Sequence, residues 1–137
     1  MAGTFSLQIV TPEREVYASQ VESVTLPGME SSFGVLRNHA PLIAALEAGV
    51  VHIVDAELKE VSLAVGGGFF QVAQNQAILL ADSAEFPHEI NLDRVRESES
   101  KARSSLEGQL EGEQFQREQA EAALKRARVR MRLVGGK

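Results

Sequence analysis

Residues 61–95, VSLAVGGGFFQVAQNQAILLADSAEFPHEINLDRV, contain the point at which the chain changes its hydrophobic period. Before Pro87, apolar residues alternate with polar or small ones, which is typical of β-strands with one buried face. After Pro87, Asn91 is a good helix N-cap, and apolar residues then recur at spacings of three and four, which is typical of an amphipathic helix. The sequence therefore predicts a β domain over residues 1–87 and a helical domain over residues 88–137.

The β domain contains many short runs of strand-forming residues. Two of these runs, residues 5–9 and 61–65, alternate strictly between apolar and other residues. Four more runs are rich in Val and Ile, at residues 21–26, 41–46, 50–54 and 69–72. Turn signals separate the runs at residues 27–28, 38–41, Gly49, 66–68 and Asn75. Short strands in close succession, with no helix between them, predict an antiparallel sandwich or barrel.

Two helices are predicted in the second domain. Ile90 and Val95 flank the Asn91 cap at the positions of a hydrophobic staple, and Gly108 and Gly112 bracket a predicted turn. The second helix carries an apolar stripe of Phe115, Ala120, Ala123, Leu124, Ala127, Met131 and Val134. The pair is interpreted as an antiparallel helical hairpin. Because alanine buries little area, and burial contributes only about 25 cal/mol per Å², the hairpin is expected to dock weakly. It is either a movable element or an ordinary helical appendage.

The net charge of −5 is unevenly distributed along the chain. Residues 1–87 carry a net charge of −7, residues 88–137 carry +2, and no acid follows Glu121. An acidic body with a basic end predicts two modules with different roles. The basic end has no interleaved aromatic residues, and the acidic body repels phosphate backbones, so nucleic acid is not predicted as a partner. An acidic protein partner fits the basic end better.

No feature of the sequence indicates catalysis or a metal site. The chain has no cysteine, which excludes disulfides, and His39, His52 and His88 lack the spacing of metal ligands. The three glycines at 66–68 lack a following GK[ST], so they indicate a bulge or a close backbone approach rather than a phosphate loop. Residues 1–5 lack signal-peptide features, and no apolar run reaches the roughly 20 residues that span a bilayer. Any membrane association is therefore expected to come through a protein partner.

One set of charged residues fits an anion site. Asp93 and Arg96 share a helix face, Arg103 lies on that face two turns later, and Arg126 and Arg130 lie four residues apart. An antiparallel hairpin brings the start of the first helix near the end of the second. Several guanidiniums would then lie close to one carboxylate, an arrangement that suits polyphosphate. The alternative is a set of exposed ion pairs within the helices, worth about 0.3–0.5 kcal/mol each.

Five segments, in chain order, resemble the ATP synthase epsilon subunits. They are LQIVTPER at 7–14, FGVLRNHAPL at 33–42, VGGGF at 65–69, ILLAD at 78–82 and LKRARVR at 124–130. The resemblance covers essentially the whole chain. It implies a β-sandwich of about ten strands followed by two helices, in a non-catalytic rotor subunit of a proton-translocating ATP synthase.

The resemblance also implies partners and a location. The sandwich is expected to bind the gamma subunit and to rest on the ring of c subunits through the loop at residues 30–39, at the cytoplasmic face of the cell membrane. The candidate residues of this c-ring edge are Glu30, Ser32 and His39. Extended helices are expected to contact the catalytic subunits and inhibit ATP hydrolysis. The candidate residues for that contact are Lys125, Arg126, Arg128, Arg130 and Arg132.

A regulatory ATP is a further implication, although no cofactor is required. Residues 92–97, LDRVRE, match a family motif of Ile/Leu-Asp-x-x-Arg-Ala. The implied ATP ligands are Glu85, Asp93, Arg96, Arg103, Arg126 and Arg130. Glu97 replaces the usual alanine, and its charge beside a phosphate site opposes binding by an amount on the order of kcal/mol. Two alternatives stay open: a purely structural rotor subunit, and a chaperone-like adaptor that presents a helical hairpin from a β body.

Overall fold

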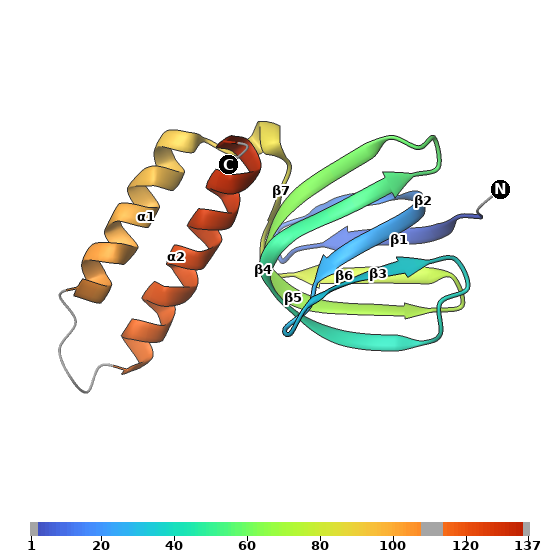
Figure 1. Cartoon of the computed structure of the whole chain (residues 1–137), viewed down its shortest axis with the longest axis horizontal. Coiled ribbons are helices and arrows are strands. Elements are labelled where there is room, and N and C mark those ends of the chain that lie inside the picture. The colour runs from blue at the N-terminus through green and yellow to red at the C-terminus, as the bar shows by residue number, and fades with distance from the viewer. Residues whose placement is uncertain (1–2, 108–113, 136–137) are drawn as a thin grey trace.

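The computed structural model describes residues 3–107 and 114–135, with the side chains of 104–107, 114–117 and 135 outside the description. A β domain forms one end of the molecule, and a helical hairpin stands against its side (Figure 1). The strands are β1 (Phe5–Val10), β2 (Glu15–Pro27), β3 (Ser32–Leu36), β4 (Leu42–Asp55), β5 (Glu60–Ala73), β6 (Gln76–Ala81) and β7 (Ala84–Glu85). They are followed by a 3₁₀ turn, η1 (Pro87–Glu89), and by the helices α1 (Leu92–Glu107) and α2 (Gln114–Gly135). The predicted order of a β domain and then a hairpin is confirmed.

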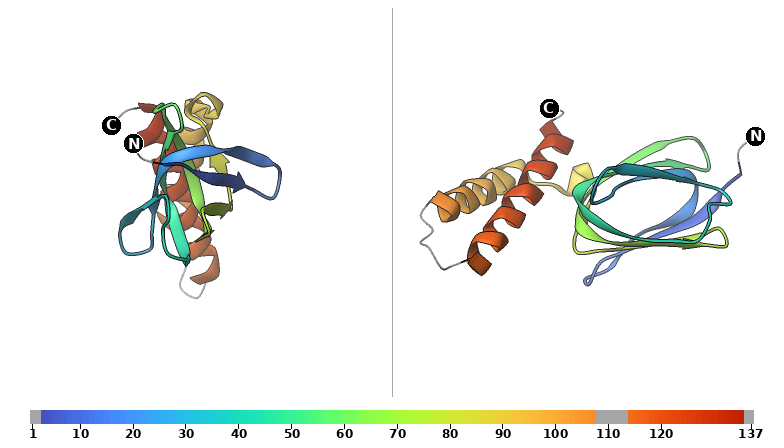
Figure 2. Two further views of the ribbon diagram at one scale, coloured as in Figure 1. Left: turned by 90° about the vertical axis from the view of Figure 1, so that its right-hand side faces the viewer. Right: turned by 60° about the horizontal axis from the view of Figure 1, so that its bottom comes forward.

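Five strands close into a flattened barrel with two facing layers (Figure 2). Their order is β1, β6, β5, β4 and β2, and β1 closes the barrel because it pairs with both β6 and β2. The β1–β6 pair is parallel, and the other pairs are antiparallel. β3 extends the sheet as an edge strand on β2, and the short β7 pairs with β5. The closed path leaves β3 and the short β7, each of which pairs with one other described strand, with an unpaired outer edge.

The described part of the chain has seven strands, rather than the ten or so that the resemblance implies. The predicted runs at 41–46 and 50–54 form the single strand β4, and those at 61–65 and 69–72 form β5. The glycines between them bend the strands without ending them. A Cβ on Gly49 would overlap with the Pro27 ring, and one on Gly68 would overlap with the Leu80 carbonyl oxygen. Gly67 and Gly68 therefore allow a close backbone approach, as predicted, with φ of +104° and +146°.

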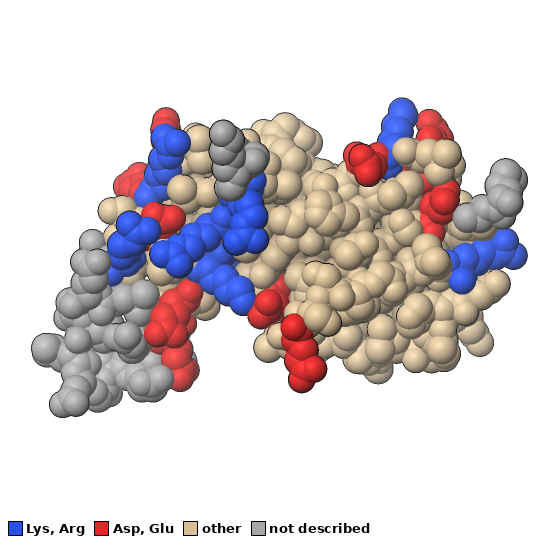
Figure 3. Space-filling view, viewed as in Figure 1, with Lys and Arg blue, Asp and Glu red and all other residues tan. Residues whose placement is uncertain are grey.

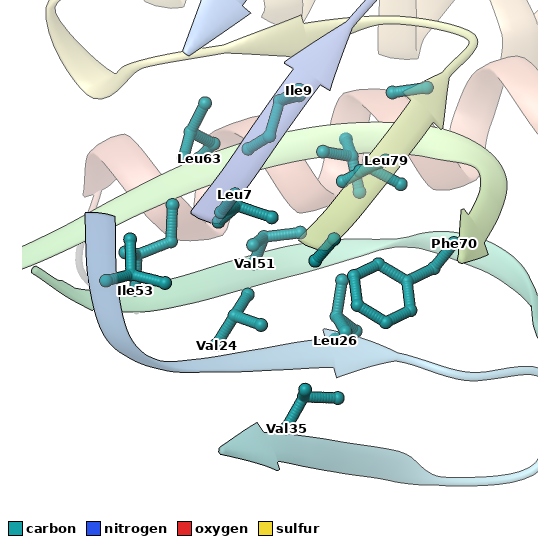
Figure 4. Close-up of a cluster of buried hydrophobic side chains, with 14 of the residues drawn as sticks. Leu7, Ile9, Val24, Leu26, Val35, Val51, Ile53, Leu63, Phe70 and Leu79 are labelled. Atoms are coloured by element: carbon teal, nitrogen blue, oxygen red, sulfur yellow. The ribbon is translucent and has the colours of Figure 1, made fainter. Parts of the chain in front are cut away.

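The core of the barrel is built from inward-facing residues of all seven strands. Figure 4 shows side chains from both layers pointing toward one another. The fully buried ones are Phe5, Leu7, Ile9, Val21, Val24, Leu26, Val35, Val51, Ile53, Leu63, Phe70 and Leu79. Full burial of one such side chain contributes about 1.5–3 kcal/mol. The barrel is therefore the stable body of the molecule.

The connection between the two domains is held by Glu89. Its carboxylate accepts a hydrogen bond from the Phe86 backbone N–H (3.0 Å) and pairs with Arg14 of the β1–β2 turn (2.6 Å). The Phe86 hydrogen bond, and after it the Arg14 side chain, lower the pKa of Glu89. These contacts fix the direction in which the chain leaves the barrel.

The predicted start of the hairpin is confirmed. The Asn91 side-chain oxygen accepts a hydrogen bond from the Arg94 backbone N–H (3.0 Å), which caps α1. Ile90 and Val95 are both buried in one cluster, as the staple predicts. The predicted turn at Gly108 and Gly112 lies outside the described residues. Within the described residues, neither helix combines the length and apolarity needed to cross a bilayer.

Candidate functional site

A small second hydrophobic cluster joins the hairpin to the barrel. Its buried members are Ala64 of β5, Ile90, Val95, Ala127 and Val129, and it is separate from the barrel core. α2 is the helix that lies against β4 and β5, while α1 packs on α2 (Figure 1). Ala127, which was predicted to lie in the apolar stripe of this helix, is buried in the cluster. The burial of Val129 was not predicted, because only one apolar stripe was expected on this helix. α2 instead packs on two sides, against the barrel and against α1.

Two ion pairs connect α2 to the barrel. Lys125 Nζ lies 2.8 Å from Glu47 Oε2 of β4, and Arg130 Nε pairs with Glu85 Oε1 of β7. The Arg130 and Glu85 side chains are only 26 % and 29 % exposed. Glu85 Oε1 itself is buried, and the guanidinium of Arg130 compensates its charge. An ion pair of this kind is less screened by salt than an open surface pair.

The candidate ATP ligands are brought together only in part. Arg126 and Arg130 line a narrow space over Gly66 and Ser83, next to Glu85. Arg103 instead pairs with Glu99 one helical turn away, at 2.7 Å. Asp93 and Arg96 are exposed in the first turns of α1, and neither makes a hydrogen bond or ion pair with another described residue. The start of α1 does lie beside the end of α2, since Ile90 and Val95 share a cluster with Met131 and Val134.

The predicted cations of α2 divide between two sides of the helix. Arg126 and Arg130 face β5 and Ser83. Lys125, Arg128 and Arg132 line a groove of about 550 Å³ on the other side, opposite Glu47 and Ala48 of β4. In the space-filling view, Lys and Arg side chains gather over the hairpin, beside a barrel face on which few charged side chains are seen (Figure 3). Docking therefore covers part of the basic set and leaves part of it open.

The candidate c-ring residues do not lie on one loop. Ser32 begins β3 and Glu30 precedes it, whereas His39 follows the end of β3. Four residue steps at about 3.3 Å each separate the two ends of this strand by roughly 13 Å. The expected loop at 30–39 is thus an edge strand between two turns. The second turn is held by a reciprocal pair, in which Asn75 Oδ1 accepts from the Asn38 N–H (2.6 Å) and Asn75 Nδ2 donates to Asn38 Oδ1 (3.0 Å).

An exposed apolar patch, which the sequence did not predict, lies on the outer face of the barrel. Ile43, Phe69 and Leu80 are 74 %, 61 % and 52 % exposed. Phe69 is paired directly with Leu80 on one side and with Ala45 on the other, and Ile43 lies two residues from Ala45 on the same face. A signal for this patch is present in the Phe69-Phe70 and Leu79-Leu80 pairs, because successive side chains of a strand point to opposite faces.

Two residues of the docking contact were also missed. Glu47 is a single charge inside the apolar run of β4, and that interruption is a usable signal. Gly66 lies directly under the Arg126 side chain, where a Cβ would come within 2.8 Å of Arg126 Cδ. Its role was hidden because the helix that covers it lies far along the chain.

A barrel or sandwich body, a thinly docked basic hairpin and an exposed apolar patch together define a protein that works through contacts with partner chains. Residues 4–87 match the family model of the ATP synthase delta/epsilon chain β-sandwich domain, and residues 88–135 match that of its long α-helix domain. The chain belongs to the ATP synthase delta/epsilon chain family, and within it to the bacterial epsilon chains.

Curated relatives and solved structures agree with this assignment. An ATP synthase epsilon chain from Anaeromyxobacter sp. is 45 % identical over 131 residues, covering 95 % of this chain and 97 % of the relative. The epsilon chain of Moorella thermoacetica is 41 % identical over 132 residues, covering 96 % and 97 %. A chain of the Euglena gracilis mitochondrial ATP synthase has a similar fold, with a TM-score of 0.80 at 20 % identity, covering 94 % of this chain and 80 % of that one. A chain of the Tetrahymena thermophila central stalk and c-ring has a TM-score of 0.61 at 14 % identity, covering 94 % and 95 %.

The family assignment decides between the alternatives left by the sequence. The resemblance to epsilon subunits is confirmed, and epsilon chains are non-catalytic subunits of ATP synthase. The chaperone-like adaptor is therefore set aside. A regulatory rotor subunit and a purely structural one remain.

Proposed function

We propose that this chain is a rotor subunit in the central stalk of a proton-translocating ATP synthase, peripheral to the cytoplasmic face of the cell membrane. In this role it couples proton flow to ATP synthesis on other subunits. The family assignment supports the proposal, as does the fold shared with a chain of the Tetrahymena central stalk and c-ring. The rigid barrel serves as the anchor, binding the gamma subunit on one surface and meeting the c-ring through the edge that carries Glu30, Ser32 and His39.

The gamma subunit is proposed to cover the apolar patch of Ile43, Phe69 and Leu80. Contiguous exposed apolar surface marks an interaction site more often than an ordinary solvent face. Phe69→Asp is expected to reduce co-purification with gamma, because it places a charge in the middle of the covered surface. Leu58→Asp is the matched control, since Leu58 is 67 % exposed at the tip of the β4–β5 hairpin. Equal retention of gamma by both variants would contradict this assignment.

The hairpin is proposed to act as a brake on ATP hydrolysis. The observation that carries this proposal is the small hydrophobic cluster between the hairpin and the barrel: five buried residues, two of them alanines, with five partly buried ones packed against them, separate from the barrel core. Because so little apolar area holds α2, a partner with differential affinity can shift the population between docked and extended states. In the extended state, Lys125, Arg126, Arg128, Arg130 and Arg132 are proposed to contact acidic segments of the catalytic subunits.

Reversal of the exposed cations tests the brake. The triple variant Lys125→Glu, Arg128→Glu and Arg132→Glu is expected to relieve inhibition of ATP hydrolysis in the assembled complex. Lys101→Glu, an exposed reversal on α1, is the control. If the triple variant and a deletion of residues 88–137 both leave hydrolysis unchanged, the chain is a purely structural rotor subunit.

A regulatory ATP is proposed at the hairpin, held by Glu85, Asp93, Arg96, Arg103, Arg126 and Arg130. The two guanidinium groups of Arg126 and Arg130, which lie together beside Ser83, support the phosphate end of this site, although the space between them is closed in the docked structure and both side chains must move to admit a phosphate. Glu97 is exposed on the first turns of α1, so its charge opposes a polyphosphate there. Titration of the isolated chain with ATP, followed by amide NMR, is expected to saturate, to weaken in Arg126→Ala and to strengthen in Glu97→Ala. A flat titration at millimolar ATP would remove the site.

A further inference from the structure

The strand register places two acids on either side of the line followed by α2. Glu47 of β4 lies opposite the glycine bend of β5, between the pairs Leu46–Gly68 and Ala48–Gly66. Glu85 of β7 pairs with Ala64 on the other side of β5. The helix meets these acids with Lys125 and Arg130, five residues apart, and the buried Ala127 lies between them. Each acid is therefore paired with a cation on its own side of the docked helix, Glu47 with Lys125 and Glu85 with Arg130.

Gly66 provides room for a third contact between these two ion pairs. A Cβ at this position would overlap with Ser83 Oγ and come within 2.8 Å of Arg126 Cδ. The φ of Gly66 is not in the left-handed region, since the positive-φ glycines of the described residues are Gly67 and Gly68. The absence of a side chain at position 66 thus leaves a space, and the Arg126 side chain occupies it.

We propose that Glu47, Glu85 and Gly66 form an acidic docking surface that imitates the acidic partner of α2 and competes with it. Docked, Lys125 and Arg130 are already paired with carboxylates of their own chain, so both pairs must break before these cations can bind elsewhere. The surface is thus an intramolecular decoy that sets how readily the hairpin leaves the barrel. The competition rests on the proposed function of the hairpin as a brake, whereas the docking surface does not.

The two pairs respond differently to salt. The Lys125 and Glu47 side chains are 49 % and 38 % exposed, whereas those of Arg130 and Glu85 are 26 % and 29 % exposed. Charges exposed to solvent are screened over about 10 Å at 0.1 M salt, and partly buried charges less so. Added salt therefore weakens the Glu47 contact first, and Glu85 holds the helix under conditions in which Glu47 no longer does.

A single reactive thiol measures the docking equilibrium in the full chain. The sequence has no cysteine, so Val129→Cys introduces the one thiol, at a docked position that is 4 % exposed. The rate of labelling by a small thiol reagent is then proportional to the undocked fraction. In this background, Glu47→Gln with Glu85→Gln is expected to raise the rate by roughly 2- to 25-fold, since each partly exposed ion pair contributes a factor of about 1.4 to 5.

Two further variants serve as comparisons. One removes the same charge elsewhere on the barrel, and the other changes the shape of the docking surface without changing its charge. Glu57→Gln with Glu60→Gln removes the same charge from the β4–β5 hairpin, and its rate is expected to stay within twofold of the parent. Gly66→Val keeps both acids but displaces Arg126, and its rate is expected to rise. Far-UV circular dichroism checks that each variant is folded. Unchanged labelling in both the Glu47/Glu85 double variant and Gly66→Val would overturn the docking surface, whatever the hairpin does in the complex.

ATP hydrolysis by the assembled complex tests the competition. If the surface is a decoy, the Glu47→Gln, Glu85→Gln variant inhibits hydrolysis more strongly than the wild type, because α2 is released more often. Faster labelling with unchanged hydrolysis would keep the docking surface and overturn the decoy, together with the proposed brake. Faster labelling with weaker inhibition would overturn the decoy alone, because the two acids would then assist the partner contact.

Discussion

Truncation of one residue in each hydrophobic cluster tests whether the two domains are separate cooperative units. Leu79 of β6 is fully buried in the barrel core, and Val129 of α2 is 4 % exposed in the hairpin cluster. Leu79→Ala leaves a cavity in a closed core, where such changes cost about 2–5 kcal/mol. Val129→Ala removes two methyl groups from a thin contact, which at about 0.8 kcal/mol per buried group gives about 1.6 kcal/mol.

Native-state hydrogen exchange, followed by NMR for each amide, measures both effects in the full chain. Leu79→Ala is expected to lower the free energy of exchange for the most protected amides of β1, β4, β5 and β6, which report global unfolding. Val129→Ala is expected to lower it in α2 by about 1.6 kcal/mol, with the strands unchanged. Leu36→Ala, at a residue that is 61 % exposed, controls for surface truncation and should change neither.

The reasoning fails if Val129→Ala lowers the protection of the β6 amides as much as that of the α2 amides. That result would mean that the hairpin and the barrel share one cooperative core. A hairpin that unfolds only with the barrel could not leave it, and the switching part of the proposed function would be lost with it.

Three further predictions concern the cap, the domain connection and the distal turns. Asn91→Ala is expected to cost about 0.5–2 kcal/mol, seen as faster exchange of the first α1 amides, whereas Asn91→Asp should retain protection; equal fraying in both would contradict the cap. Because the folded-state pKa of Glu89 is lowered, its charge stabilises the fold above its ordinary pKa of about 4.3, and this contribution is lost as the pH falls through the lowered value. Urea unfolding should therefore show wild type more stable than Glu89→Gln at pH 7, with the difference gone in acid; a constant difference would exclude the linkage. Asn75→Ala removes two hydrogen bonds to Asn38 and places alanine at a φ of +60°, so it should lower the free energy of unfolding by about 1–3 kcal/mol in thermal unfolding. Asn75→Gly should recover only the part of this loss that comes from backbone strain. Full recovery in the glycine variant would show that the hydrogen bonds contribute nothing.

Strand boundaries show where local reading of the sequence stops. Gly49 and the glycines at 66–68 were interpreted as turns, yet both lie within long strands. Whether a glycine ends a strand or bends it depends on what approaches it. Here the approaching groups are the Pro27 ring and the Leu80 carbonyl, which come from other strands. No window of sequence contains that information.

The candidate anion site shows the same limit. Spacing alone grouped Asp93, Arg96 and Arg103 on one helix face, but the structure pairs Arg103 with Glu99 and leaves the other two exposed. In the described part of the chain, Glu47 and Glu85 are the barrel acids that pair with α2, through Lys125 and Arg130. Lys125 and Glu47 are 78 residues apart in the chain. Only a fold brings such residues within reach of one another.

The class of each domain, and the point at which the chain changes from one to the other, can be predicted from short segments of sequence. Hydrophobic period, the Asn91 cap and the flanking Ile90 and Val95 are local properties, set by backbone geometry over a few residues. By contrast, the folded chain is needed to know which strands are continuous, which face of the barrel is apolar and exposed, and which acids pair with α2. Packing and ion pairing depend on distance in space, and the closed barrel sets those distances by joining β1 to both β2 and β6.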